Sequence, residues 1–255
     1  MPHAVSRLRT ARLALSTTPF LDRGGSRQQR CAGCRLIASH CMCALRPVVP
    51  TRAGMCLIMA DVEPLKPSNT GWLVADVVAD TAAFGWARTE VDPALLAMLN
   101  DPQWQPYVVF PGEFVAPERV ITSVPSLSSG AAVGAGSTGK RPLFVVLDGT
   151  WSQACKMLRK SPYLNHLPVL SLPPGQLSRY HLRRSNREHH FCTSEVAALC
   201  LAMVGEPHAA QTLEAYLDVF VHHYLQARQQ LPVDTNGVAH QRLRDLRLAG
   251  VGETV

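Results

Sequence analysis

Four of the eight cysteines lie within 13 residues, in the order Cys31-x2-Cys34-x6-Cys41-x-Cys43. A Cys-x2-Cys pair lets two thiolates reach one metal ion from a tight turn, and a second close pair completes a tetrahedral site of four sulfurs, which suits zinc. The sequence therefore predicts a structural zinc site. Redox chemistry is the alternative, and His40 is a substitute ligand to be considered.

A second candidate for chemistry is Asp148, which follows the apolar run at 143–147 and opens the turn Asp148-Gly-Thr150-Trp151. Val-Val at the centre of so short a run favours a buried parallel strand, and the helix formers at 152–160 favour a helix after it. Ligands of open α/β sheets bind at carboxyl ends of strands and at helix amino termini. Asp148 is therefore predicted to lie at a ligand site. In the alternative interpretation Asp148 only caps its helix and Trp151 only packs.

Turn residues also follow other predicted strands. The loop after the first strand carries Ser68, Asn69 and Thr70, which are typical of a helix start, and another strand ends in Pro111-Gly112. We expect strands at 55–60, 81–86, 107–110, 143–147 and 167–172, and helices at 73–78, 93–100, 152–160, 193–204 and 210–230. This alternation predicts a mainly parallel α/β sheet whose site lies along one edge.

Charge is unevenly distributed along the 255 residues. The net charge is +8 over residues 1–52, −6 over 53–139, +7 over 140–190 and −3 over the remainder. A polyanionic partner would explain the two basic blocks, and solvated surface is the alternative. We divide the chain into a basic N-terminal arm with the cysteine knuckle (1–50), an α/β domain (51–232) and a C-terminal tail (233–255).

The sequence contains no run of 18 apolar residues and no signal peptide, so we expect a soluble cytoplasmic protein with no membrane contact. The segment Gly134-Ala-Gly-Ser-Thr-Gly139-Lys140 matches most of a phosphate-binding P-loop. A P-loop continues with Ser or Thr and a helix, whereas Arg141-Pro142 and a strand follow here, so we interpret the segment as a loop.

Two further polar segments lie near the start of the helix predicted at 193–204. In the stretch at 179–188, Tyr180 stands among four arginines and could stack on a base while the arginines hold phosphates. His181, His189 and His190 could join Cys192 in a second metal site, but no recurrent spacing supports one.

Taken together, these residues resemble the DTW-domain tRNA-uridine aminocarboxypropyltransferases, the bacterial enzymes above all. The resemblance runs from about residue 31 to about residue 224 and rests on four motifs in order. They are the cysteine knuckle, the loop Lys66-Pro-Ser-Asn-Thr-Gly71, the turn Asp148-Gly-Thr150-Trp151 and the helix start Thr193-Ser-Glu195.

The resemblance implies transfer of the 3-amino-3-carboxypropyl group of S-adenosylmethionine to N3 of a uridine in the variable loop of tRNA (position 47). The by-product would be 5′-methylthioadenosine. It also implies kinship with the SPOUT-like transferases, whose sheet edge forms a trefoil knot. Asp148 matches the family's acid and is the expected catalytic residue: a base for the N3 proton, a group that orients N3, or a stabiliser of the sulfonium. We expect the donor pocket to be lined by Thr70, Pro111, Leu147, Asp148, Thr150, Trp151 and Thr193.

We further predict that the knuckle, with zinc on Cys31, Cys34, Cys41 and Cys43, folds the N-terminal arm onto the main domain and presents its arginines to tRNA. An RNA methyltransferase on the same scaffold is the first alternative function. A non-catalytic nucleic-acid-binding protein with a zinc knuckle is the second. A P-loop nucleotide hydrolase is the third.

Overall fold

The central element of the fold is a sheet of six parallel strands in the order β2-β1-β5-β3-β6-β4. The computed structural model describes residues 2–17, 29–126, 139–173, 182 and 191–252. The strands are β1 Gly54–Met59, β2 Thr81–Gly85, β3 Trp104–Val109, β4 Val120–Ile121, β5 Arg141–Asp148 and β6 Val169–Leu170. The predicted α/β class and the parallel sheet are confirmed.

Both faces of the sheet are buried, which explains why its central strands are continuously apolar. Successive side chains of a strand point to opposite faces. Accordingly Leu57 and Met59 of β1 belong to one core cluster, whereas Ile58 belongs to the other. In β5, Val146 faces the first cluster and Leu147 the second.

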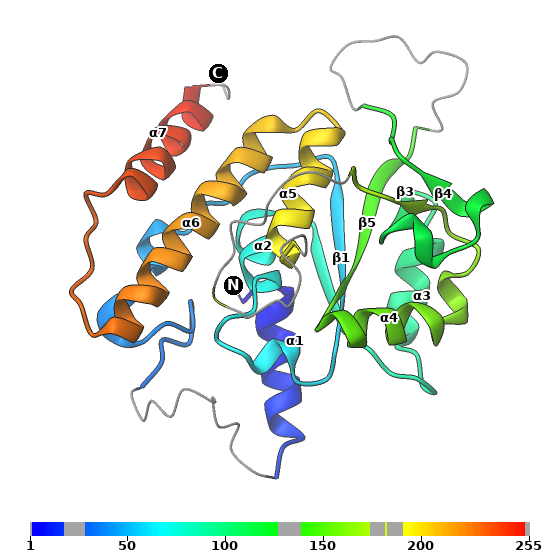
Figure 1. Cartoon of the computed structure of the whole chain (residues 1–255), viewed down its shortest axis with the longest axis horizontal. Helices are drawn as coiled ribbons and strands as arrows, with labels where there is room; N and C mark the ends of the chain where they lie inside the picture. Colours follow the sequence, from blue (N-terminus) through cyan, green and yellow to red (C-terminus); the bar gives the residue numbers. More distant parts are fainter. Residues whose placement is uncertain (1, 18–28, 127–138, 174–181, 183–190, 253–255) are drawn as a thin grey trace.

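Helices cover the two faces unequally (Figure 1). The first face carries α1 Ala4–Ala14, α2 Gly71–Val77, α5 Thr193–Met203, α6 Pro207–Gln229 and α7 Val238–Gly252; the second carries α3 Pro93–Asn100 and α4 Trp151–Arg159. Short 3-10 helices lie at Ala38–His40, Cys43–Leu45, Glu63–Leu65, Gly112–Phe114, Pro117–Arg119 and Pro162–Leu164. None of the described helices is both long and apolar enough to cross a membrane.

Most predicted elements are present, with ends displaced by a few residues. The sequence prediction started β3 too late, at 107, because Gln105 and Pro106 interrupt the apolar pattern, although the strand begins at Trp104. It also made β6 too long and missed β4; both are two-residue strands. The helix predicted at 193–204 begins after the N-cap Cys192, whose backbone N–H donates to Glu195 Oε2 at 2.7 Å.

The segment predicted as a C-terminal tail contains α7, which lies against α6. The contact is polar as well as apolar: Leu243 is buried in the first core cluster, and His240 Nε2 lies 2.8 Å from His223 Nε2 on α6. The division into domains and the trefoil knot stay predictions.

Candidate active site and metal site

Asp148 ends β5 and is held by side chains from two other parts of the chain. Its Oδ2 accepts a hydrogen bond from Asn69 Nδ2 at 2.7 Å, and its Oδ1 accepts one from the Thr193 hydroxyl at 2.7 Å. These partners lie 79 and 45 residues away in sequence. The carboxylate is 3% exposed. Three segments that are distant in sequence therefore meet at one buried acid.

Asp148 lies at a point where the connections that follow two neighbouring strands lead to opposite faces of the sheet. Strands β1 and β5 are neighbours, and Met59 of β1 pairs with Asp148 of β5. After β1 the chain continues to α2 on the first face, whereas after β5 it continues to α4 on the second. Diverging connections of this kind open a crevice at the carboxyl ends of the strands, where ligands of α/β sheets bind.

Asn69 links Asp148 to a second buried acid. Its Oδ1 accepts from the backbone N–H of Trp72 at 3.0 Å, which turns the amide nitrogen towards Asp148 and towards Glu63 Oε1, 3.4 Å away. Glu63 is fully buried, and its Oε2 accepts from Lys66 Nζ at 2.5 Å. Glu63 was not predicted as a site residue, because its only local signal is the i,i+3 spacing to Lys66 after a strand end.

Gly71 is required by close approach. A Cβ atom at this position would lie 2.6 Å from Asp148 Oδ2 and 3.3 Å from Leu57. The glycine of the loop motif therefore lets the start of α2 pack directly against the acid.

Three of the predicted site residues come together. Thr70 Oγ1 accepts from the backbone N–H of Ser194 at 3.4 Å, which joins the loop before α2 to the start of α5. Thr193 donates to Asp148. The Ser194 hydroxyl is buried and has no hydrogen-bond partner among the described residues, so a polar group remains to be satisfied beside this cluster.

The other predicted site residues lie elsewhere around the end of β5. Thr150 is exposed and caps α4, in a capping box with Gln153, so Asp148 is not the cap. The Leu147 side chain packs in the core on the α3/α4 face, and Pro111 follows β3 as the cap of a 3-10 helix. Their lining of a donor pocket stays a prediction.

Trp151 belongs to a group of three rings, Phe110, Phe114 and Trp151, which we call the aromatic cluster. The Phe110 and Trp151 rings are stacked with centroids 5.3 Å apart and planes inclined by 11°. Phe114 packs edge-on against both, with its centroid 5.2 Å from that of Trp151. The cluster joins the loop after β3 to the first residue of α4.

The four sulfurs of the cysteine knuckle lie within 4.8 Å of one another. Cys31 Sγ is 3.5 Å from both Cys41 Sγ and Cys43 Sγ, and Cys34 Sγ is 3.8 Å from Cys41 Sγ. Zinc–sulfur bonds of about 2.3 Å in a tetrahedron put sulfurs about 3.8 Å apart, so the residues fit a zinc ion. A Cβ on Gly33 would lie 2.6 Å from Cys43 Sγ, so glycine is needed in this turn.

The protonation of the knuckle thiols is uneven. At Cys31, burial raises the pKa, but hydrogen bonds from the backbone N–H groups of Cys34 and Gly33 and from the side chains of Cys41 and Cys43 together lower it to about 7. Burial raises the pKa of Cys34 to about 11. The cluster thus contains one thiol that ionises readily and one that needs a cation to do so.

The knuckle is tied to the candidate active site by Arg35. This side chain is 2% exposed; it donates to the carbonyls of Lys66 at 2.7 Å and Asn69 at 2.9 Å. Its guanidinium lies 4.2 Å from the centre of the Trp72 ring, whose Nε1 donates to the Gly33 carbonyl at 3.0 Å. The knuckle therefore braces the loop that carries Asn69.

Other arginines of the N-terminal arm also bind the main domain. Arg9 donates to the carbonyl of Leu65 at 2.8 Å, and Arg12 forms an ion pair with Asp61 at 2.6 Å. The arm is folded onto the domain as predicted. The guanidinium groups of Arg9, Arg12 and Arg35 are engaged within the chain, and the presentation of the arm's arginines to tRNA stays a prediction.

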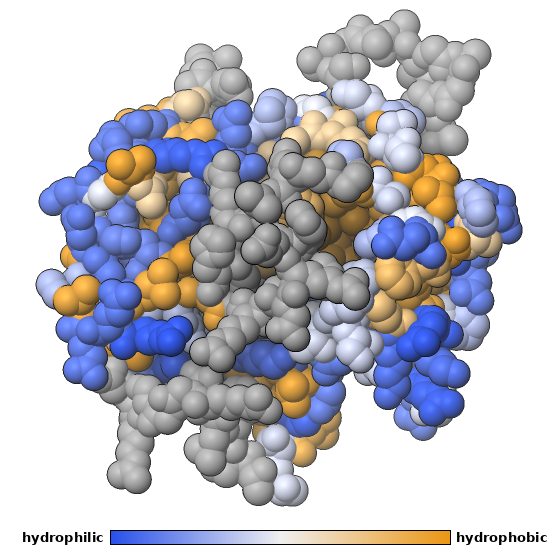
Figure 2. Space-filling view, in the orientation of Figure 1, coloured by the Kyte–Doolittle hydropathy of each residue, from blue (hydrophilic) through white to orange (hydrophobic). Residues whose placement is uncertain are grey.

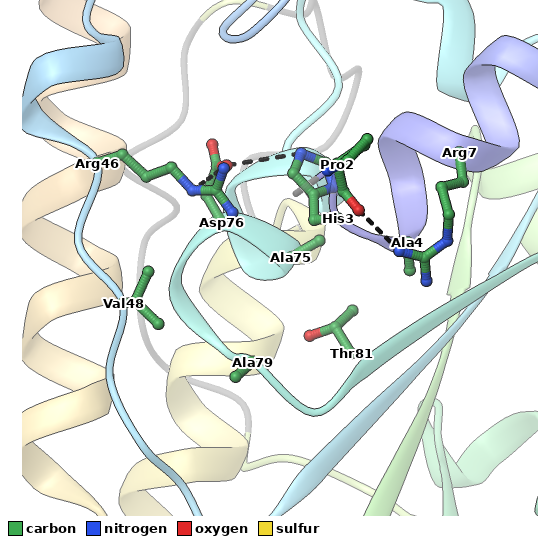
Figure 3. Close-up of a pocket in the computed structure, with 10 residues that line it drawn as sticks. All are labelled: Pro2, His3, Ala4, Arg7, Arg46, Val48, Ala75, Asp76, Ala79 and Thr81. Atoms are coloured by element: carbon green, nitrogen blue, oxygen red, sulfur yellow. Dashed lines mark hydrogen bonds and ion pairs between the residues drawn. The ribbon is translucent and has the colours of Figure 1, made fainter.

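A cavity of about 230 Å³ lies between α1 and α2, and Arg46, His3 and Asp76 are among the residues that line it (Figure 3). Arg46 Nε is 2.8 Å from Asp76 Oδ1, and His3 Nε2 is 3.5 Å from the same oxygen. Burial, against the opposing charge of Arg46, raises the pKa of Asp76 to about 6; burial and the same arginine lower the pKa of His3 to about 3. These groups fasten α1 to α2, away from Asp148.

Apart from residue 182, the basic stretch at 179–188 lies outside the described residues, as do the histidines at 181, 189 and 190 and residues 134–138 of the glycine-rich segment. Of that segment, Gly139 has a positive φ and Lys140 is exposed immediately before β5.

Fold and site together define an α/β protein with a buried acid at a switch point of the sheet and a four-cysteine knuckle braced against it. The chain belongs to the DTW domain family, whose model matches residues 28–225. The protein tRNA-uridine aminocarboxypropyltransferase 2 of Drosophila melanogaster is 34% identical over 98 residues, which cover 38% of this chain and 36% of that protein. The match thus spans about a third of the curated relative. No solved structure matches the chain.

Proposed function

We propose that the protein transfers the 3-amino-3-carboxypropyl group of S-adenosylmethionine to N3 of a variable-loop uridine of tRNA, in the cytoplasm. Membership of the DTW domain family and the name of the relative from Drosophila melanogaster support the reaction class. The observation that carries the proposal is Asp148, a buried acid held at a switch point by groups from the loop before α2 and from the start of α5.

The transfer requires a base for the N3 proton or a negative charge beside the sulfonium, rather than an acid that protonates the leaving group. As N3 attacks the γ-carbon of the donor, it loses its proton, and the carbon–sulfur bond breaks with its electron pair left on sulfur. The sulfonium is already a good leaving group, so the protein need not protonate it. Asp148 would take the N3 proton, orient N3, or stabilise the sulfonium.

The neighbours of Asp148 would position it for any of these roles. Asn69 donates to Oδ2 and Thr193 donates to Oδ1. Gly71 has no side chain that would press against Oδ2. Thr70 and the Ser194 hydroxyl, which has no partner among the described residues, lie at the same junction and would offer hydrogen-bonding groups to the donor. Holding the reacting groups in line supplies much of the rate enhancement expected at such a site.

The test is an incubation of the purified protein with unmodified tRNA and S-adenosylmethionine labelled in the aminocarboxypropyl carbons, followed by nucleoside mass spectrometry. We expect a labelled uridine derivative and released methylthioadenosine. Labelled S-adenosylhomocysteine would instead show a methyltransferase, and an untouched donor would favour a binding protein.

Asp148→Asn tests the acid, with Glu90→Gln as the control at an exposed position. A base or a charge stabiliser predicts a fall in kcat of about 10²–10⁴-fold. Unchanged donor affinity would favour the base, whereas weaker donor binding would favour the sulfonium role. Turnover at the wild-type rate by a folded variant would refute both.

We propose zinc as the ion of the knuckle, in a structural role. Cys31, Cys34, Cys41 and Cys43 would hold it, and four thiolates leave no open position for a substrate. Elemental analysis should find about one zinc per chain. Cys31→Ser should lose the metal, and Cys155→Ser, at a single cysteine on α4, should keep it.

A further inference from the structure

Three exposed cations lie on one side of α4 and its C-cap, and we call them the α4 basic face: Lys156, Arg159 and the C-cap Lys160. Positions three and four apart lie next to each other on a helix surface, so the charges form one stripe. Figure 2 shows hydrophilic and hydrophobic surface side by side in the region where Figure 1 places α4.

These cations have no acidic partner within the part of the chain that the structure describes. Arg159 Nε donates to the Cys155 carbonyl in its own helix at 3.2 Å, and Lys156 Nζ lies 5.7 Å from the centre of the Trp86 ring. The sequence has no Asp or Glu from 149 to 187. The arginines of the N-terminal arm discussed above are, by contrast, bonded to the main domain. The α4 basic face therefore presents positive charge that no described acidic side chain neutralises in an ion pair.

A partly exposed aromatic ring lies at the N-terminal end of α4. Phe114 is 44% exposed, and the other large apolar residues exposed in the described chain are leucines and valines. Its ring is fixed in place by Trp151, the first residue of α4 and the third after Asp148. A partly exposed ring that packs on the residue three positions after the candidate acid is suited to stacking on a base that has left its helix.

We propose that the α4 basic face and the Phe114 ring together form the docking surface for the RNA substrate. The cations would bind phosphates, and the ring would stack on a nucleobase near Asp148. At about 1.5 Å per residue, α4 extends the surface about 13 Å away from the ring. The inference rests on the proposed function and deepens it, because it places the RNA on the second face of the sheet.

Simpler explanations cover only part of these observations. The negative end of the helix dipole accounts for Lys156 and Arg159 in the last turn of α4 and for Lys160 at its C-cap. It does not account for an exposed phenylalanine at the opposite end of the helix. An acidic protein partner would use the charge but would leave the ring without a role.

The test measures tRNA binding by fluorescence anisotropy as a function of salt, without the donor. We compare the wild type with the α4 variant Lys156→Ala/Arg159→Ala/Lys160→Ala. The matched control is Arg228→Ala/Arg244→Ala/Arg247→Ala, which removes the same charge from α6 and α7 on the first face. We expect the α4 variant to bind about 10–100-fold more weakly and its log–log salt slope to fall by about 2 to 3, with little change in the control.

Phe114 is tested separately, by Phe114→Ala against Phe114→Tyr. Stacking on one base is worth about 1–3 kcal/mol, so the alanine variant should bind about 5–150-fold more weakly and the tyrosine variant nearly as well as wild type. Thermal melting of each variant checks that it is folded.

The outcomes separate the two proposals. Equal losses of tRNA affinity in the α4 variant and the control, or no loss in either, would overturn the docking surface while label transfer by the wild type still supported the function. A wild type that binds no tRNA would overturn the docking surface as well. Salt-dependent binding through α4 without any label transfer would support the surface and refute the transferase.

Discussion

Replacement of Arg35 by methionine tests whether the knuckle braces the candidate active site. Met keeps the length and apolar stem of the side chain but removes the donors to the carbonyls of Lys66 and Asn69. Hydrogen bonds from a charged donor contribute about 1.5–3 kcal/mol each, so two buried ones give about 3–6 kcal/mol. Solvent does not reduce this value, because Arg35 is 2% exposed. For a chain of this size the melting temperature should fall by about 6–24 °C.

The assay combines thermal melting with donor binding and zinc content. Arg88→Met is the matched control, because Arg88 is exposed on the loop after β2. We expect the Arg35 variant to keep zinc when folded but to bind the donor more weakly, since the loop carrying Asn69 loses its support. Melting within about 2 °C of the wild type, with unchanged donor affinity, would refute the reasoning.

Three further predictions concern the junction at Asp148, the α6/α7 contact and the metal. Gly71→Ala should displace the Asp148 carboxylate, which a Cβ would approach to 2.6 Å, and should lower kcat about 10²-fold, whereas Gly85→Ala, with only an ordinary contact at 3.8 Å, should not. Burial lowers the pKa of both His223 and His240, so their contribution to stability is present above pH about 6.5 and is lost as the pH falls. The free energy of unfolding, measured with urea, should therefore decrease from pH 7 to pH 5, and the decrease should be smaller in His240→Gln. An equal decrease in the wild type and the variant would contradict this prediction. Chelation of zinc should lower the melting temperature of the wild type but not that of Cys31→Ser, and a drop of equal size in both would count against a metal held by the knuckle.

Local patterns were sufficient to predict the parts of the fold that leave a signal in a short stretch of sequence. Strand β5 was recognisable because an interior parallel strand is apolar on both faces, and the sequence at 143–147 is continuously apolar. The knuckle was recognisable from its spacing, because two close cysteine pairs can reach one ion without help from the rest of the fold. Helix α3 was predicted with its observed ends, because Asp92 and Pro93 give it a clear start.

The partners of Asp148 could not be derived from local patterns. Asn69 and Thr193 reach it only because β5 enters the sheet between β1 and β3, and strand order has no local signature. The sequence also gave no sign that Arg35 crosses from the knuckle to the loop before α2. Helix α7 was missed because its pattern is largely polar and few of its side chains are buried against α6.

The strand order has a consequence for the nascent chain. Strands β1 and β3 flank β5 in the sheet, yet both precede it in the chain. At about 5–20 residues per second, β1 waits about 4–18 seconds for the ribosome to add the residues up to Asp148. During this interval the apolar edges of β1 and β3 lack their central partner, and such edges promote aggregation. We therefore expect the yield of folded protein to depend on translation speed and on chaperones that cover these edges until β5 emerges.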